Sequence, residues 1–285
     1  MKTWRVIDLI EWTTEYFECH EIPTPRLDAE LLLGHVLQQS RLQLYLRFEM
    51  PVFQNQLSKF RESIKRRAAH TPVSYLTNHR EFMSMDFYVN QHVLIPRPET
   101  EILVETVLGK QQDACRFIDI GTGCGAIAIS IAYNRPGFEI LATDLSAEAL
   151  EVAQQNAVAH HCIDRITFLH GDLFTPLQDL SNPRFDWIVS NPPYVSTAET
   201  SILSPDVREH EPEVALFAGL DGLSVVRRLV ADAPKFLNPR GKLILEVGYD
   251  QGHEVRDLIE SHPAYNDCQI IKDYSGIDRV ILASV

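Results

Sequence analysis

Apolar residues recur at two different spacings along the chain, and the change of spacing divides the chain into parts. Through residues 4–70 they recur every three or four positions, which places them on one face of a helix. The first such set is Val6, Leu9, Ile10, Thr13 and Phe17. Thr24-Pro25 and Ser40 are typical of helix starts, and Lys65 to Arg67 suits a helix C-terminus. This part is predicted to be a small helical bundle.

The spacing changes after Thr71-Pro72. Alternation through residues 81–95 predicts a β-hairpin connector, and from residue 96 onward strands and helices follow one another. The predicted strands cover 116–120, 138–143, 166–170, 185–190, 241–247, 268–272 and 278–283, and the predicted helices cover 98–109, 125–133, 146–158, 222–236 and 251–260. This order predicts an α/β fold with a mostly parallel, doubly wound sheet whose last strands pair antiparallel.

Composition places the chain among soluble globular proteins. It has 285 residues, of which 45% are apolar and 23% charged, enough for one large domain and one small one. No apolar run reaches the roughly 18 residues that span a bilayer, so no membrane association is expected. The N-terminal residues do not resemble a secretory signal. Five scattered cysteines, an odd number, indicate reduced thiols and a cytoplasmic location.

Acidic charge is concentrated in the second part of the chain. Residues 1–70 carry 10 basic and 9 acidic side chains, whereas residues 71–285 carry 16 basic and 30 acidic ones. A phosphate backbone is bound by clustered lysine and arginine, so direct nucleic-acid binding is not expected.

A glycine-rich turn follows the first strand of the predicted sheet. Gly121, Gly123 and Gly125, interleaved with Thr122 and Cys124, lead from an apolar strand into a helix. Glycine permits a tight turn and close approach of a ligand to the backbone. The spacing differs from the dinucleotide pattern Gly-x-Gly-x-x-Gly, and Asp119 is expected to face the ligand end of the loop. A carboxylate there disfavours a pyrophosphate and suits a cationic amino acid tail.

Two carboxylates follow the next strands. Asp144 ends the second strand, where a carboxylate can accept hydrogen bonds from both ribose hydroxyls; alternatively, it caps the helix that begins near Ser146. Asp172 follows the third strand, where it can accept from an adenine amine while Leu173 covers the ring. An ordinary polar strand end is the alternative for Asp172.

The sequence Asn191-Pro192-Pro193-Tyr194 directly follows an apolar strand. Two prolines stiffen the backbone where the strand ends. The Asn191 side-chain oxygen and the Pro192 carbonyl can hold both N–H bonds of a planar amide or amine, whose nitrogen is a poor nucleophile, and Tyr194 can pack on its plane. This arrangement predicts transfer of a methyl group to nitrogen, carried mainly by positioning. A loop built from turn-forming residues is the alternative.

Several segments together resemble the HemK/PrmC family of release factor glutamine methyltransferases. They are 26–32, 72–77 with 80–82, 94–101, the glycine loop, Asp144, 191–194, 211–223, 246–251 and 275–279. Within them, Leu94 to Glu101 is the more specific match, because generic methyltransferases lack it. Asn78 stands where the family usually has glycine, and Leu173 where some relatives carry tryptophan.

The resemblance implies a fold, a reaction and a site. The implied parts are a helical domain over residues 1–72 that docks release factors, a hairpin linker over 73–97, and a seven-stranded, Rossmann-like class I methyltransferase domain over 98–285. The implied reaction is N5-methylation of the glutamine in the Gly-Gly-Gln motif of peptide chain release factors, with S-adenosylmethionine converted to S-adenosylhomocysteine and no metal. Residues 121–125, Asp144, Asp172, Leu173 and Asn191 would hold the cofactor, and residues 191–194 the glutamine.

Two other functions share parts of this pattern. A nucleic-acid adenine N6-methyltransferase meets the same geometric problem and can use the same tetrapeptide, but it must also grip phosphates. A protein that only binds the cofactor would not need the tetrapeptide. The roles of Arg97, which either reaches the cofactor or fixes the linker, and of Glu246, which either lines the site or bonds to a loop, are left open.

Overall fold

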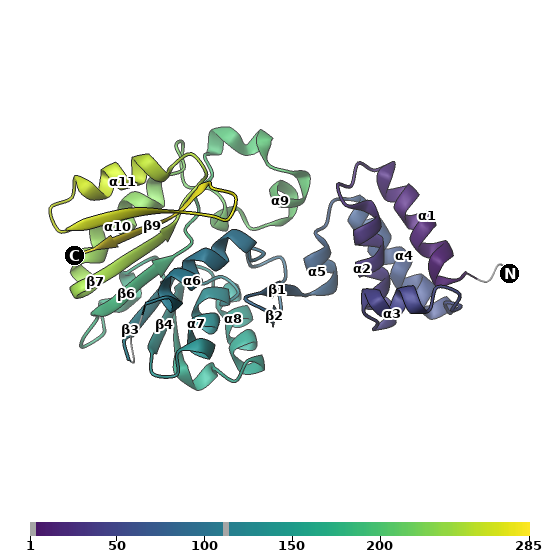
Figure 1. Cartoon of the computed structure of the whole chain (residues 1–285), viewed down its shortest axis with the longest axis horizontal. Coiled ribbons are helices and arrows are strands. Elements are labelled where there is room, and N and C mark those ends of the chain that lie inside the picture. The colour runs from purple at the N-terminus through teal and green to yellow at the C-terminus, as the bar shows by residue number, and fades with distance from the viewer. Residues whose placement is uncertain (1–3, 111–113) are drawn as a thin grey trace. The chain divides into compact units, whose positions relative to one another are not determined.

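The computed structural model describes residues 4–110 and 114–285, which form two compact units (Figure 1). The first unit runs to His79 and includes residues 204–210. The second unit comprises residues 80–203 and 211–285.

The first unit is the predicted helical bundle. Its helices are α1 (Val6–Glu18), α2 (Pro25–Leu37), α3 (Arg41–Leu46), α4 (Gln54–Ala68) and α5 (Val73–Thr77). The face of α1 that was predicted from spacing is buried from Val6 to Phe17. Ser40 caps α3 by accepting a hydrogen bond from the Gln43 N–H. Asn78 ends α5 with a φ of 52°, the left-handed conformation that asparagine tolerates in place of glycine.

A short helix from the distant part of the chain completes this unit. Helix α9 (Pro205–His210) brings Asp206 to the buried Arg67, whose Nη1 lies 3.0 Å from the Asp206 carboxylate. The Arg67 Nε lies 2.7 Å from Asp28 on its other side. A buried guanidinium needs such partners, because an unpaired charge in the interior is costly. No sequence pattern predicts that this helix belongs to the first unit.

The second unit is built on a seven-stranded sheet in the order β5-β4-β3-β6-β7-β9-β8. Its strands are β3 (Arg116–Ile120), β4 (Glu139–Asp144), β5 (Ile166–His170), β6 (Phe185–Ser190), β7 (Leu237–Glu246), β8 (Asp267–Lys272) and β9 (Asp278–Ser284). Strands β3 to β7 are parallel, whereas β9 pairs antiparallel with β7 and with β8. The predicted fold class and the antiparallel end of the sheet are confirmed.

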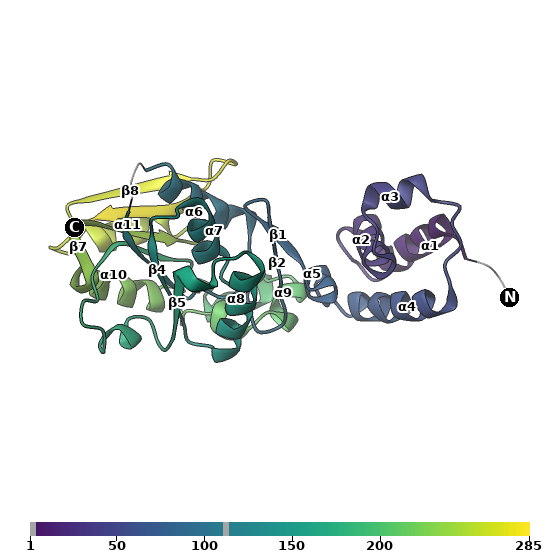
Figure 2. The same ribbon diagram turned by 90° about the horizontal axis from the view of Figure 1, so that it is seen from below.

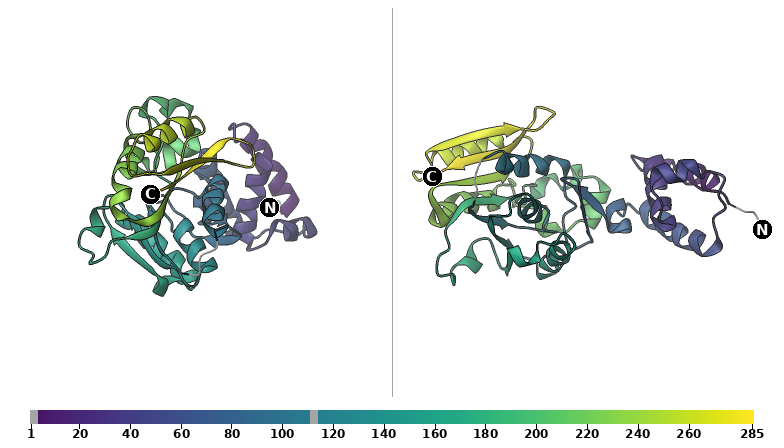
Figure 3. Two further views of the ribbon diagram at one scale, coloured as in Figure 1. Left: turned by 60° about the vertical axis from the view of Figure 1, so that its left-hand side comes forward. Right: turned by 60° about the horizontal axis from the view of Figure 1, so that its bottom comes forward.

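Helices cover both faces of this sheet (Figures 2 and 3). Neighbouring helices α6 (Glu101–Leu108), α7 (Ala126–Asn134) and α8 (Ala147–Ala159) contact one another in sequence order, and α10 (Ser224–Phe236) contacts α11 (Gly252–Glu260). Ile118, Ile188 and Leu243 pack with the buried faces of α10 and α11. Alternate residues of a strand point to opposite faces, so the strands between these layers are largely apolar on both faces.

Short elements connect these layers. Strands β1 (Arg80–Phe82) and β2 (Met85–Phe87) form the predicted hairpin, with Met83 and Ser84 at positive φ in its turn. The 3-10 turns are η1 (Pro98–Thr100), η2 (Ile163–Arg165), η3 (Thr175–Leu177), η4 (Thr197–Ile202) and η5 (Glu213–Ala215). In the described part of the chain, no helix is long and apolar enough to cross a membrane.

The order of strands fixes where a ligand can bind. The chain runs outward from β3 to β5 and then returns to the other side of β3 with β6. Loops that leave β3 and β6 therefore diverge, and a crevice opens outside the carboxyl ends of the two strands.

Candidate active site

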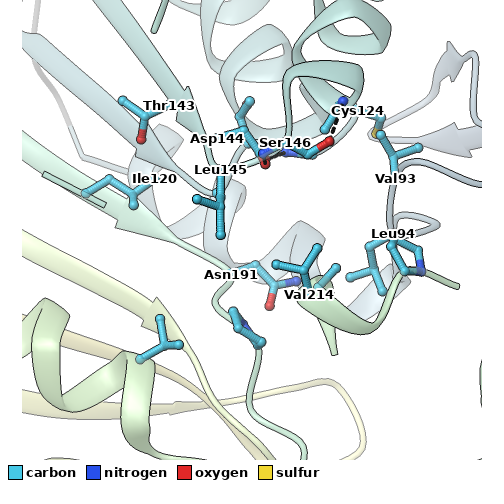
Figure 4. A pocket seen from close by; sticks show the side chains of 18 of the residues that line it. Val93, Leu94, Ile120, Cys124, Thr143, Asp144, Leu145, Ser146, Asn191 and Val214 are labelled. Carbon is cyan, nitrogen blue, oxygen red and sulfur yellow. Dashed lines mark hydrogen bonds between the residues drawn. The ribbon is translucent and has the colours of Figure 1, made fainter. Parts of the chain in front are cut away.

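A cavity of about 260 Å³ lies at this crevice (Figure 4). The ends of β3, β4 and β5 and the turn after β6 contribute to its wall, together with parts of the linker and of residues 212–217. In Figure 4, Asn191 and Val214 lie below the end of β4, which is marked by Thr143 and Asp144. The predicted residues at the cavity wall are Gly121, Thr122, Gly123, Cys124, Asp144, Asp172, Leu173, Asn191 and Pro193.

The glycine loop is held mainly by its own backbone. The N–H groups of Gly121 and Thr122 both donate to the Thr143 carbonyl at 2.9 Å, which joins the ends of β3 and β4. Gly121 and Gly123 have φ of +75° and +56°, and a Cβ on either would meet nothing within 4 Å. Gly125 is different: it lies behind the cavity wall, where a Cβ would come within 2.7 Å of Ile129. Two glycines therefore keep the turn open and the third allows close packing.

Asp119 lies beneath the loop and is fully buried. Its Oδ2 accepts from the Thr122 hydroxyl at 2.7 Å and from the Ala128 N–H at 3.3 Å, whereas Oδ1 is buried without a partner among the described residues. Burial raises the pKa of Asp119 to about 7. Asp119 is not part of the described cavity wall, so it supports the loop from below.

Asp144 is hydrogen-bonded from both sides. Its Oδ2 accepts from the Gly123 N–H at 2.8 Å and its Oδ1 from the Ser146 N–H at 2.9 Å. The following helix is capped by Ser146, whose hydroxyl accepts from the Ala149 N–H. Ser146 therefore caps the helix with its side chain, and Asp144 remains at the cavity wall. Burial raises its pKa.

Asp172 and Leu173 form the wall after β5. The Asp172 carboxylate pairs with the Arg228 guanidinium at 2.5 Å, and both side chains are about half exposed. Leu173 adopts a φ of 49°, which is uncommon for a residue with a Cβ. Arg228 also lines the cavity, and no sequence pattern pointed to it.

Asn191 stands where β6 ends, beside the glycine loop. The hydroxyl of Ser190 donates to the Ile120 carbonyl at 2.7 Å, which ties the ends of β6 and β3 together. The Asn191 side-chain N–H donates to the Thr100 hydroxyl oxygen at 3.1 Å. One of its two amide hydrogens is therefore used by Thr100, and its carbonyl oxygen can accept a hydrogen bond.

Tyr194 is fixed at both its side chain and its backbone. Its hydroxyl donates to Glu246 at 3.3 Å, and its carbonyl accepts from the Gln251 side chain at 2.9 Å. Gly222 packs against the same carbonyl so closely that a Cβ would come within 2.3 Å of it. Burial raises the pKa of the Tyr194 phenol.

Arg97 and Glu211 join the linker to the segment after η4. Arg97 forms an ion pair with the buried Glu211 at 2.6 Å, and the Ile95 N–H donates to the same carboxylate. Arg97 is absent from the described cavity wall, so this geometry matches the interpretation in which it fixes the linker.

Some residues of the cavity were not predicted from the sequence. Residues 92–94, Pro96 and Thr100 come from the linker and η1, and Ala215 and Phe217 come from the segment after Pro212. Most of these residues lie within the segments that resemble the family, and that resemblance is the only sequence feature that could have indicated a place in the site. Among residues 4–110 and 114–285, no group of three or more His, Cys, Asp or Glu is arranged to hold a metal ion.

Comparison with known proteins defines the class first. Residues 98–205 match the family model of the methyltransferase small domain, and residues 8–77 match that of the PrmC N-terminal domain. A solved methyltransferase from Pyrococcus furiosus shares the fold, with a TM-score of 0.52 at 18% identity over 81% of this chain and 98% of that one. The fold and the cavity are those of a Rossmann-like methyltransferase.

Full-length relatives then define the family. The release factor glutamine methyltransferase of Geobacter sulfurreducens is 39% identical over 98% of this chain and 96% of its own length. That of Moorella thermoacetica is 45% identical over 92% of each chain. The chain belongs to the release factor glutamine methyltransferase family.

Proposed function

We propose that this chain transfers a methyl group from S-adenosylmethionine to the side-chain amide nitrogen of the glutamine in the Gly-Gly-Gln motif of peptide chain release factors. The names of its full-length relatives support the choice of substrate. The orientation of Asn191 is the observation that carries the proposal, because its donated N–H leaves the carbonyl oxygen free to accept from an amide NH2.

The residues at the cavity wall support binding of S-adenosylmethionine. The Asp144 carboxylate would accept hydrogen bonds from the ribose hydroxyls. The open backbone at Gly121 and Gly123 gives room for the amino acid tail, and Asp172 with Leu173 serves the adenine. When bound, S-adenosylmethionine supplies a methyl group on a positively charged sulfur and leaves as S-adenosylhomocysteine.

The turn after β6 would orient the glutamine amide nitrogen, which is a weak nucleophile. The nitrogen of an amide shares its lone pair with the carbonyl, so it must be held in line with the methyl group. Asn191 would accept one N–H and the Pro192 carbonyl the other, while Tyr194 packs on the amide plane. A carbon–nitrogen bond forms, the carbon–sulfur bond breaks with its electron pair going to sulfur, and one amide proton is released. Positioning of this kind supplies a large part of a rate enhancement.

We also propose that the first unit docks the release factor. Helix α3 presents Leu42 and Leu46 with exposed fractions of 69% and 77%, and Phe53, which precedes α4, is 67% exposed. We propose these three side chains as contacts for the release factor, because binding would remove their apolar surface from water.

Label transfer tests the proposed function. The full chain is incubated with S-adenosylmethionine labelled in its methyl group and with a release factor, its variant with alanine in place of the Gly-Gly-Gln glutamine, or DNA. We expect label only on the unmodified release factor, at that glutamine. Label on adenine of the DNA, or equal labelling of the alanine variant, would overturn the proposal.

A further inference from the structure

A buried carboxylate lies behind the turn that holds the acceptor. Glu246 is the last residue of β7, the neighbour of β6, and it is 0% exposed. One of its oxygens accepts from the Thr100 hydroxyl at 2.6 Å and the other from the Tyr194 hydroxyl at 3.3 Å. Its contacts therefore reach both polar side chains of the tetrapeptide, Tyr194 directly and Asn191 through Thr100.

The direction of these hydrogen bonds decides how Asn191 is oriented. A threonine hydroxyl has a single hydrogen, and the ionised Glu246 can only accept, so Thr100 must donate to it. The Thr100 oxygen is then left with lone pairs alone. It can accept the Asn191 N–H, as observed, but has nothing to donate to the Asn191 carbonyl oxygen.

We propose that Glu246, acting through Thr100, determines which atom of the Asn191 amide faces the acceptor, and that only its ionised form does so. Thr100 and Glu246 are positioning residues in this role, since neither has to touch the substrate. The inference rests on the proposed function, because it assigns the Asn191 oxygen to an acceptor NH2.

Protonation of Glu246 would undo this orientation. A carboxyl protonated on the oxygen that faces Thr100 donates to the Thr100 hydroxyl, whose own hydrogen is then free to bond the Asn191 carbonyl oxygen. The amide would turn over and present its NH2 to another NH2. Burial raises the pKa of Glu246 to about 7. Among the groups that face it, Arg279 on β9 and the Thr100 and Tyr194 hydroxyls favour the charged form, whereas Glu99 on η1 opposes it.

The first test is the pH profile of single-turnover methyl transfer. Only the ionised form is competent, so the wild-type rate should fall as pH falls through about 7. Glu246→Gln should lower the rate about 10- to 100-fold and remove this limb of the profile, while the cofactor Kd stays within about threefold. Thr100→Val should have the same effect and Thr100→Ser should restore most of the rate. A wild-type limb that persists in Glu246→Gln would overturn the proposal.

Two variants control for loss of a partly buried polar group. Asp186→Asn alters a carboxylate of β6 that accepts from the Arg116 N–H and from Asn238. Thr106→Val removes a hydroxyl that donates to the Ile102 carbonyl of its own helix. Both should keep the wild-type pH limb, and loss of the limb in either would show that the limb does not report on Glu246.

A second test does not depend on activity. Asparagine is labelled with nitrogen-15, and the Asn191 side-chain NH2 signal is identified by its disappearance in Asn191→Ala. We expect its proton shifts to titrate near pH 7 in the wild type and to be independent of pH in Glu246→Gln and Thr100→Val. A signal in the wild type that does not titrate refutes the inference. A titrating signal in an enzyme that labels no release factor leaves the inferred coupling intact and refutes the proposed substrate.

Discussion

The two sides of the cavity are held in different ways. On the side of β3 and β4, backbone N–H groups form the hydrogen bonds that hold the loop. Gly121 and Thr122 donate to the Thr143 carbonyl, and Gly123 donates to Asp144. On the side of β6, side chains from segments distant in the sequence form the hydrogen bonds that hold the turn. Thr100 holds Asn191, while Glu246 and Gln251 hold Tyr194.

This difference matches the roles that we propose for the two sides. A flexible cofactor tail and a ribose need room and a few hydrogen bonds, which a loop of glycines and one carboxylate would supply. A poorly nucleophilic nitrogen needs a single orientation, and only side chains fixed by further hydrogen bonds give one. We therefore expect substitutions on the two sides to separate cofactor binding from methyl transfer.

The largest expected effect comes from Asn191→Ala. It removes an acceptor that contributes only when the glutamine nitrogen is aligned, so kcat should fall about 1000-fold, equivalent to about 4 kcal/mol. The cofactor Kd, measured by calorimetry, should change no more than about threefold because Asp144 and the glycine loop are untouched. An equal loss of cofactor affinity and of kcat would contradict the separation of the two sides.

Asp144→Ala tests the opposite side. Both carboxylate oxygens are lost from the cavity wall, so the cofactor Kd should rise about 30- to 100-fold. The same variant also removes the hydrogen bond that the Gly123 N–H donates to Asp144 in the wild type. At saturating cofactor, kcat should recover to within about fivefold of the wild type. If kcat stayed 100-fold down at saturation, Asp144 would belong to the transfer step as well.

The same difference explains what the sequence alone could predict. The seven strands and the glycine loop follow from local signals: apolar runs, glycine spacing and a carboxylate at a strand end. Strand bounds such as Arg116–Ile120 and Phe185–Ser190 match the predicted ranges. The role of Asn191 stays a prediction, which rests on the rigid backbone that follows β6.

The partners of Asn191 and Tyr194 were not predictable in this way. Thr100 and Glu246 lie 91 residues before Asn191 and 52 residues after Tyr194 respectively, and nothing in their local sequence states which side chain they will meet. Hydrogen bonds between side chains depend on the packing of whole elements, here η1 and β7 against the end of β6. The contact of α9 with Arg67 in the first unit was missed for the same reason.

Stability measurements test whether Gly121 and Gly125 have different roles in the glycine loop. Gly121→Ala introduces a Cβ at a φ of +75° where nothing lies within 4 Å, so it should lower the free energy of unfolding by about 1 kcal/mol. Gly125→Ala adds an overlap with Ile129 at 2.7 Å and with Ala153 at 3.2 Å, and should cost about 2–3 kcal/mol. Urea unfolding of the two variants checks this order. Equal losses would mean that the packing behind Gly125 adapts at no cost.

The smallest expected effect is that of Tyr194→Phe, which keeps the ring and removes one hydroxyl. Its bond to Glu246 is long, at 3.3 Å, so kcat at pH 8 should fall by no more than about threefold. The Tyr194 hydroxyl favours the charged form of Glu246, and its removal therefore raises the pKa of that carboxyl. Because only the ionised form orients Asn191, the falling limb of the rate should move to higher pH in this variant. A limb that stays in place or moves to lower pH would mean that the hydroxyl does not act on Glu246, and that Tyr194 serves the acceptor through its ring alone.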